Sequence, residues 1–135
     1  VGSKLPRGPS LVATGRIRKP RTAWHCCLEL YAVATRLPQE FRLKPGDAAA
    51  LLEAEVLARF VVVELPAAQR RAFIASSARE QVRGGRLYDA HIAEIVRSSG
   101  ARLVVTENPR HFAALDREGI AVRTAAELER QTRSR

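Results

Sequence analysis

The sequence lacks the long apolar segments that mark membrane and secreted proteins. Runs such as residues 60–63 are far shorter than the roughly 20 apolar residues that a helix needs to cross a bilayer. The basic N-terminal stretch contains no apolar core of signal-peptide length. We therefore expect a chain that does not span a membrane and that stays in the cytoplasm.

Cysteine is scarce, and several catalytic motifs are missing. The two cysteines, Cys26 and Cys27, are adjacent, and neighbouring residues cannot easily adopt disulfide geometry with each other. No further cysteine stands at zinc-ligand spacing, so we interpret both as small buried side chains. The sequence also has no GxxxxGK[ST] phosphate loop, no GxSxG nucleophile elbow and no HExxH pair.

Acidic residues are absent from the first 28 positions, and the whole chain carries a net charge of +9. The first 22 positions hold six basic residues, three prolines and three glycines. Such a composition disfavours a packed core, so we expect residues 1–21 to form a basic arm with little structure of its own. Residues 22–135 are enough for one domain with a single core.

Beyond this arm, helices alternate with short apolar strands. Asp47 is expected to cap one helix, Pro66 to open the next at its first position, and Gly100 to end a third. The expected helices are 24–37, 47–59, 67–82 and 87–99, with two more from 109 and 125, and the expected strands are 60–63, 103–105 and 120–122. This order predicts an α/β fold, a three-layer α/β/α sandwich with a parallel sheet. Ligands in such folds bind beyond the carboxyl ends of the strands.

Glu29 interrupts the apolar helix predicted at 24–37. Because its neighbours include Leu28, Leu30 and Tyr31, a helix leaves the carboxylate few solvated directions. Burying an unpaired carboxylate costs several kcal/mol. Two interpretations stay open: a metal ligand, or a carboxylate at the edge of the buried face that pairs with an arginine. We interpret His25, one turn earlier, as a near-terminal helix residue.

Polar residues also stand where predicted strands end and helices begin. Asp89 lies in the first turn of a helix, where the helix dipole alone favours a carboxylate, but it is also placed to project over the strand ends. Asn108 follows the strand at 103–105 and suits the N-cap of the next helix. We interpret Glu107 as a loop carboxylate and His111 as a structural residue.

These oxygen-bearing side chains suit a particular kind of metal. Mg²⁺ and Mn²⁺ are hard cations that prefer oxygen ligands, keep bound waters and contact phosphate oxygens. Such an ion activates water and stabilises charge on a scissile phosphate. Phosphodiester hydrolysis is therefore the reaction that the residues favour.

Three segments together resemble PIN domains, in particular the VapC-like toxins of bacterial toxin–antitoxin pairs. They are AWHCCLELYAVATRLP, GGRLYDAHIAEIVRSSGARLVVTENPRHF and GIAVRTAAEL. The similarity covers about residues 22–129 and implies a PIN-like fold. It also implies a metal-dependent ribonuclease whose partners are RNA and an antitoxin protein, and which often forms a homodimer.

The resemblance assigns roles to individual residues. Glu29 in LELYAV matches a family glutamate inside an apolar helix, and Asp89 matches the aspartate of the YDA turn. Both are implied as metal ligands. Asn108 in TEN matches a polar position after the strand, with Glu107 beside it, and is implied as a third residue of the site.

The sequence departs from the family at its start, where PIN domains carry an apolar strand that ends in an aspartate. No acidic residue precedes Glu29. Residues 11–13 are the one short run that suits the strand, and no acidic residue stands at its end. We therefore expect the fold to be incomplete at the N-terminus and catalysis to be weakened or lost.

Two functions stay open from the sequence. The first is a Mg²⁺- or Mn²⁺-dependent endoribonuclease, the toxin of a toxin–antitoxin pair, with Glu29, Asp89 and Asn108 in its site. The alternative is a non-catalytic PIN remnant that binds RNA or an antitoxin. A doubly wound phosphatase is a weaker third hypothesis, because it too needs an aspartate at the end of a strand.

Overall fold

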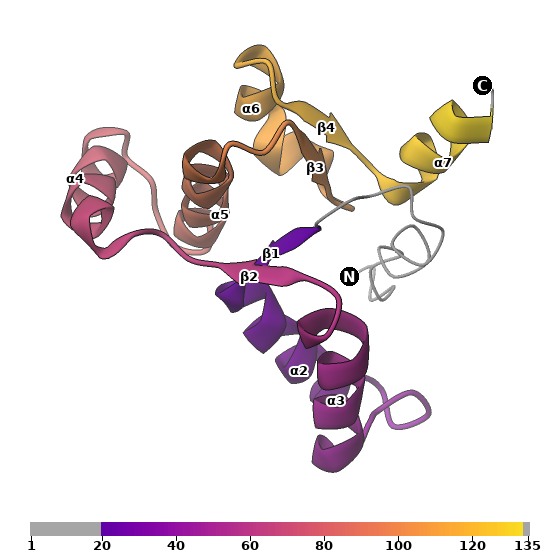
Figure 1. The fold of residues 1–135 in the computed structure, drawn as a ribbon. Coiled ribbons are helices and arrows are strands. Elements are labelled where there is room, and N and C mark those ends of the chain that lie inside the picture. Colours follow the sequence, from indigo (N-terminus) through magenta and orange to yellow (C-terminus); the bar gives the residue numbers. More distant parts are fainter. Residues whose placement is uncertain (1–19, 134–135) are drawn as a thin grey trace. The chain divides into compact units, whose positions relative to one another are not determined.

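The computed structural model describes residues 20–133 of the chain (Figure 1). The chain forms two compact units, which meet in the sequence between Val63 and Glu64. Most of the expected basic arm, with the short run at 11–13, lies outside the described residues, and the boundary after residue 21 stays a prediction. Within residues 20–133, no helix is long and apolar enough to span a bilayer.

The first unit is built on a pair of parallel strands. β1, Arg21–Ala23, runs alongside β2, Val61–Val63, with Thr22 opposite Val62. The sequence predicts β2 to within one residue, but it carries no apolar signal for β1. Backbone pairing with β2 forms β1, and three residues are too few for an alternating pattern to reveal it.

Two helices pack against each other in the same unit (Figure 1). α2, Trp24–Arg36, follows β1 directly and matches the predicted helix to within one residue. α3, Pro45–Leu52, continues into a π-helical turn, η1, Glu53–Leu57. Pro45 opens α3, so Asp47 lies in its first turn and does not cap it. Proline suits this position because its φ is helical and the first turn needs no N–H from it.

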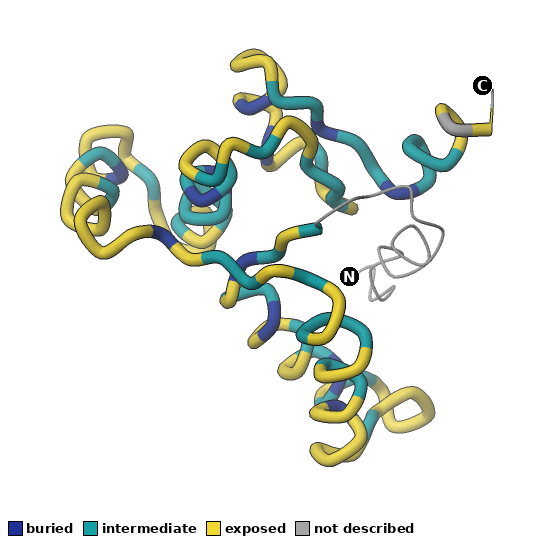
Figure 2. The backbone as a smooth tube through the Cα atoms, in the orientation of Figure 1, coloured by how far each residue is buried: buried dark blue, intermediate teal, exposed yellow. Residues whose placement is uncertain are grey.

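α2 is less buried than the sequence predicts. Its buried residues are the small Cys27 and Ala34, whereas Trp24 and Leu28 are 41% and 51% exposed. Figure 2 shows the mixture of buried and exposed residues along this helix. Small side chains let α2 approach its neighbours closely, while large ones stay on the open side. The expectation that apolar packing encloses Glu29 is therefore wrong.

The second unit begins with two helices joined by a glycine-containing turn. A 3₁₀ turn, η2, Ala67–Gln69, leads into α4, Arg70–Arg79. Gln81 has a φ of 60°, which stops the helix before its predicted end at 82. α5, Arg86–Ser99, ends at Gly100 as predicted, with a φ of 73° that glycine adopts without strain.

Two further parallel strands complete this unit. β3, Leu103–Val105, pairs with β4, Ala121–Arg123, with Val104 opposite Val122. The remaining elements are η3, Pro109–Phe112, α6, Ala113–Arg117, and α7, Ala125–Arg133. The sequence predicts β3 and the start of α7 as observed, and β4 one residue early. Because both strand pairs are parallel and helices connect the paired strands, the predicted α/β fold class is confirmed.

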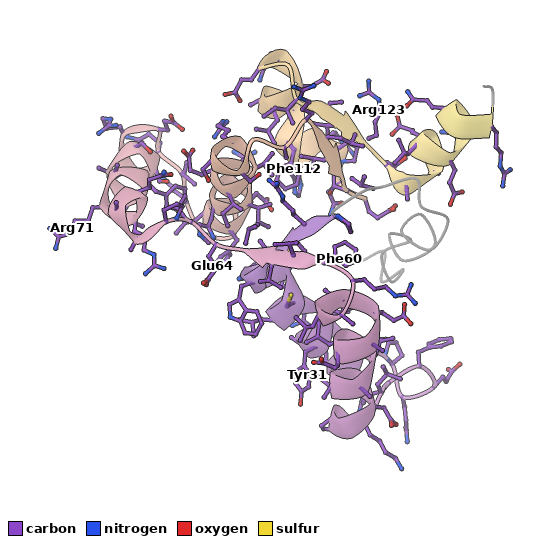
Figure 3. The ribbon with its side chains drawn as sticks, in the orientation of Figure 1. Tyr31, Phe60, Glu64, Arg71, Phe112 and Arg123 are labelled. Atoms are coloured by element: carbon purple, nitrogen blue, oxygen red, sulfur yellow. The ribbon has the colours of Figure 1, made fainter. Side chains whose placement is uncertain are left out.

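The core of the second unit lies between α5, η3, α6 and β4. Leu115 is fully buried, and Phe112 and Val122 are each 7% exposed. Ala93 of α5 completes the cluster, and Figure 3 shows Phe112 among the side chains of this region. The core therefore holds the turn η3 against α5.

Candidate active site

Glu29 lies on α2, one turn after His25. Its Oε1 atom is 3.1 Å from Nε2 of His25, and its side chain is 60% exposed. Because water surrounds much of this carboxylate, burial does not demand a compensating cation. The structure thus shows His25 as the side-chain partner of Glu29. The hypothesis that Glu29 binds a metal depends on the match of LELYAV to the family motif.

Cys26 and Cys27 are free thiols beside this glutamate in the sequence. Burial raises the pKa of the Cys26 thiol, and the negative charge of Glu29 raises it further. Burial also raises the pKa of Cys27. Both sulfurs therefore stay protonated at neutral pH, whereas a metal-bound cysteine is a thiolate. Cys27 is 1% exposed and packs as the small apolar side chain that the sequence predicts.

Asp89 lies in the first turn of α5, as predicted. Its Oδ2 atom is 3.1 Å from Nδ1 of His111, and its side chain is 34% exposed. Its other oxygen, Oδ1, has no hydrogen-bond partner among residues 20–133. Asp89 therefore has one oxygen beside the ring of His111 and one oxygen that is available to a ligand.

Asn108 occupies the N-cap position of η3, but its side chain makes no capping hydrogen bond there. Its backbone N–H instead donates to Oγ1 of Thr106 at 3.1 Å, and its carbonyl accepts the N–H of His111 at 3.1 Å. Asn108 has a φ of −122° and a ψ of 63°, and the N–H of His111, at the third position of η3, donates to the Asn108 carbonyl and not to its side chain. The exposed Asn108 side chain is thus not committed to the helix.

The second unit brings two of the three predicted residues to one place. His111 contacts the carboxylate of Asp89 with its ring and the carbonyl of Asn108 with its backbone N–H. This place follows the carboxyl end of β3, where α/β folds bind their ligands. Glu29 belongs to the first unit. Within either unit, no three His, Cys, Asp or Glu side chains of the described residues gather as a metal-binding group.

The donors that are present suit a hydrated Mg²⁺ or Mn²⁺ ion. These ions prefer carboxylate oxygens, and Mg²⁺ keeps several waters, so one or two protein carboxylates suffice. Asp89 and Glu29 are exposed enough for a hydrated ion to approach them. The donor chemistry therefore fits an ion that is bound largely through water, and it does not provide a cage of protein ligands.

Comparison with known proteins identifies the family. The model of the PIN domain matches residues 18–118, which include Glu29, Asp89 and Asn108. The chain belongs to the PIN domain family. This PIN-domain chain is 30% identical over 117 residues to Ribonuclease VapC27 of Mycobacterium tuberculosis, a match that covers 87% of the chain and 82% of that protein. No solved structure matches the chain.

The family match confirms the resemblance to VapC-like PIN domains that the sequence motifs indicate. It spans all elements from β1 to α6, whereas α7 lies beyond it. The sequence motifs give no sign that the ring of His111 lies beside Asp89. The spacing of three residues between Asn108 and His111 is that of a backbone hydrogen bond within a turn, and this bond is present. The contact of His111 with Asp89 joins residues far apart in the chain, so local sequence does not reveal it.

Proposed function

We propose that this PIN-domain protein is a Mg²⁺- or Mn²⁺-dependent endoribonuclease and the toxin of a toxin–antitoxin pair. Glu29 and Asp89 are the proposed carboxylate ligands of the ion, and Asn108 is the proposed third polar group of the site. The observation that carries the proposal is Asp89, a partly exposed carboxylate with one unpaired oxygen beyond the end of β3. Membership of the PIN family and the similarity to a protein named a ribonuclease support it.

The chemistry divides between the ion and the residues. When bound, the ion would activate water and stabilise charge on the scissile phosphate. Asp89 would present its Oδ1 atom to the ion, and the exposed amide of Asn108 would donate a hydrogen bond to a phosphate oxygen or a water. Residues 1–28 supply no carboxylate, so we propose that the chain cuts RNA slowly.

The proposed partners are those that membership of the PIN family and the similarity to Ribonuclease VapC27 imply. RNA is the substrate, and an antitoxin protein is the partner that controls the activity. We further propose that the protein acts in the cytoplasm and forms a homodimer.

A second function is favoured by the exposed arginines of the second unit. Arg70, Arg71 and Arg79 of α4 are all exposed, and they make no ion pair with the described residues. Such a surface binds phosphates whether or not a metal is present. The alternative proposal is therefore a PIN protein that binds RNA or an antitoxin without cutting.

The test is cleavage of a mixed RNA pool by the purified full chain in Mn²⁺, Mg²⁺ or EDTA. We expect cleavage in Mn²⁺ or Mg²⁺, none in EDTA, and loss of cleavage in Asp89→Asn and Glu29→Gln. Asp47→Asn is a matched control, because Asp47 also lies in the first turn of a helix and is exposed. Glu40→Gln, at an exposed loop carboxylate, is the control for Glu29→Gln.

Each outcome distinguishes the two proposals. Metal-dependent cleavage that is lost only in the site variants supports the ribonuclease. A folded chain that binds RNA equally well in EDTA and in Mn²⁺, and never cuts it, supports the binding protein. Equal cleavage by all variants would indicate a contaminating nuclease and would contradict the assignment of Asp89 and Glu29.

A further inference from the structure

Tyr88, the neighbour of Asp89 on α5, exposes its aromatic ring. Its exposed fraction is 53%, whereas Ala93 and Ile95 of the same helix are 8% and 4% exposed. The helix therefore packs with one side and leaves this ring in water, although burial of an aromatic ring is favourable. Because successive residues lie about 100° apart around a helix, Tyr88 and Asp89 project in adjacent directions from its first turn.

The segment that leads to this ring is basic. Residues 81–88 read QVRGGRLY and contain two charged residues, Arg83 and Arg86, both of which are exposed. Arg83 donates to the amide oxygen of Gln81 at 3.3 Å, and neither guanidinium pairs with a carboxylate among residues 20–133. The positive charge beside the ring therefore suits a polyanion and disfavours a basic partner.

The turn before α5 leaves room for a strand to approach. Gly84 and Gly85 separate the two arginines, and beyond their chain neighbours no atom lies within 4 Å of the place where a side chain would begin. α4, which carries the exposed arginines described above, lies beside α5 (Figure 1). The rings of Phe73 and His91 join these helices with centroids 5.5 Å apart. The exposed ring and the basic side chains thus belong to one packed pair of helices.

We infer that Tyr88 is a base-stacking residue for RNA: its ring takes the face of an unpaired base, while Arg86 contacts a phosphate of the same strand. This inference rests on RNA as the proposed ligand of the protein. Aromatic side chains on positively charged surfaces bind single strands in this way, because every base has a π-face. A base that stacks on Tyr88 brings its strand beside Asp89, the proposed metal ligand.

The first measurement is fluorescence anisotropy of a labelled single-stranded RNA with the full chain in EDTA, where the ion is absent. We expect Tyr88→Ala to bind the RNA about 5- to 150-fold more weakly than the wild-type chain, because a stacked base is lost. Tyr88→Phe should keep most of the affinity, since it keeps the ring. Phe41→Ala is the matched control, because Phe41 is an aromatic residue of the first unit that is 66% exposed.

A strand of the same length built from abasic residues separates stacking from phosphate binding. It carries the phosphates but no bases, so the wild-type chain should bind it more weakly than RNA. Tyr88→Ala should narrow this difference and leave the slope of log affinity against log salt unchanged. Arg86→Gln should instead weaken the binding of both strands and reduce that slope by roughly 0.7.

The outcomes separate this inference from the proposed function. Equal RNA affinity of wild type and Tyr88→Ala, in a chain that cuts RNA, would overturn the stacking role alone. RNA that is bound through Tyr88 but never cut in Mn²⁺ would support the stacking role and contradict the catalytic function. Absence of RNA binding by the wild-type chain would contradict both.

Two further results would also overturn the stacking role. An equal loss of affinity in Tyr88→Phe and Tyr88→Ala would assign the effect to the hydroxyl group and not to the ring. A change in the oligomeric state of RNA-free Tyr88→Ala, measured by analytical ultracentrifugation, would show that a second copy of the chain covers the ring.

Discussion

The guanidinium of Arg97 and the carboxylate of Glu118 form a bidentate pair. Nε of Arg97 donates to Oε1 at 2.9 Å, and Nη2 donates to Oε2 at 2.9 Å. The pair links α5 to the turn that follows α6. Its hydrogen bonds lower the pKa of Glu118 below the ordinary value of 4.5 and raise the pKa of Arg97. Both side chains reach solvent, so the effect on stability should be modest and sensitive to salt.

The lowered pKa of Glu118 predicts how this stabilisation depends on pH. Because the folded chain binds the Glu118 proton less readily than the unfolded chain, the pair contributes fully above the ordinary value of 4.5. The contribution disappears as the pH falls through the lower pKa of the folded state. We expect urea unfolding to show wild type more stable than Glu118→Gln at neutral pH, with the difference shrinking in acid. Glu80→Gln, at an exposed carboxylate of the same unit, should show no such convergence.

The start of α7 is closed by reciprocal hydrogen bonds between Thr124 and Glu127. The N–H of Thr124 donates to Oε1 of Glu127 at 3.0 Å, and the N–H of Glu127 donates to Oγ1 of Thr124 at 3.1 Å. We expect Thr124→Ala to lower the free energy of unfolding by about 0.5–2 kcal/mol, because a helix N–H loses its partner. Thermal or urea unfolding measures it. Ser98→Ala, which removes a hydroxyl inside α5, should cost less, and an equal cost would contradict the capping explanation.

Leu115 is the largest fully buried side chain of the chain's described part. We expect Leu115→Ala to destabilise the protein by about 2–5 kcal/mol, since the substitution removes buried methyl groups and leaves a cavity. Leu103→Ala is the matched control, because Leu103 lies in the same unit and is 37% exposed. Chemical denaturation of both variants checks the prediction. A cost at Leu103 as large as at Leu115 would show that the buried cluster does not dominate the stability of this unit.

The arginines of α4 should bind RNA phosphates. Arg70 and Arg71 are exposed, and Figure 3 shows Arg71 projecting away from the helix. We expect Arg70→Glu with Arg71→Glu to weaken RNA binding in EDTA, and to reduce the slope of log affinity against log salt by roughly 0.7 per lost contact. Fluorescence anisotropy at several salt concentrations measures both effects.

The control for this prediction replaces an arginine on another element. Arg117→Glu makes the same kind of charge reversal at an exposed residue of α6. If it weakens binding per charge as much as the α4 substitutions do, total charge governs RNA binding. The prediction of a local surface on α4 would then be wrong.

Where local chemistry decides a structural feature, the sequence predicts it well. Gly100 ends α5 because glycine adopts the left-handed conformation that a helix end needs. The apolar run Leu103–Val105 forms β3, since its two valines are β-branched and favour extended strands. Asp89 lies in the first turn of α5 as predicted, and the family motifs place it and Asn108 within the PIN match.

Features that depend on distant partners were not predictable in this way. β1 has no pattern of its own and exists because β2 offers backbone hydrogen bonds. The apolar neighbours of Glu29 in the sequence suggest a buried carboxylate, but its side chain is exposed. Its exposure depends on which side of α2 the other elements cover. Asn108 has the right residue type for a cap, but its side chain makes no capping bond.

By itself, the sequence determined the α/β class, the order of helices and strands and the PIN family. Secondary-structure propensities, helix ends and motifs depend on residues that are close together in the chain. Only the tertiary structure decided that His111 meets Asp89, that Glu29 pairs with His25 at the surface, and that Leu115 lies deepest in its core. The physical reason is that side-chain contacts and burial depend on how separate elements pack. A contact such as that between Asp89 and His111 arises only when packing brings the elements that carry them together.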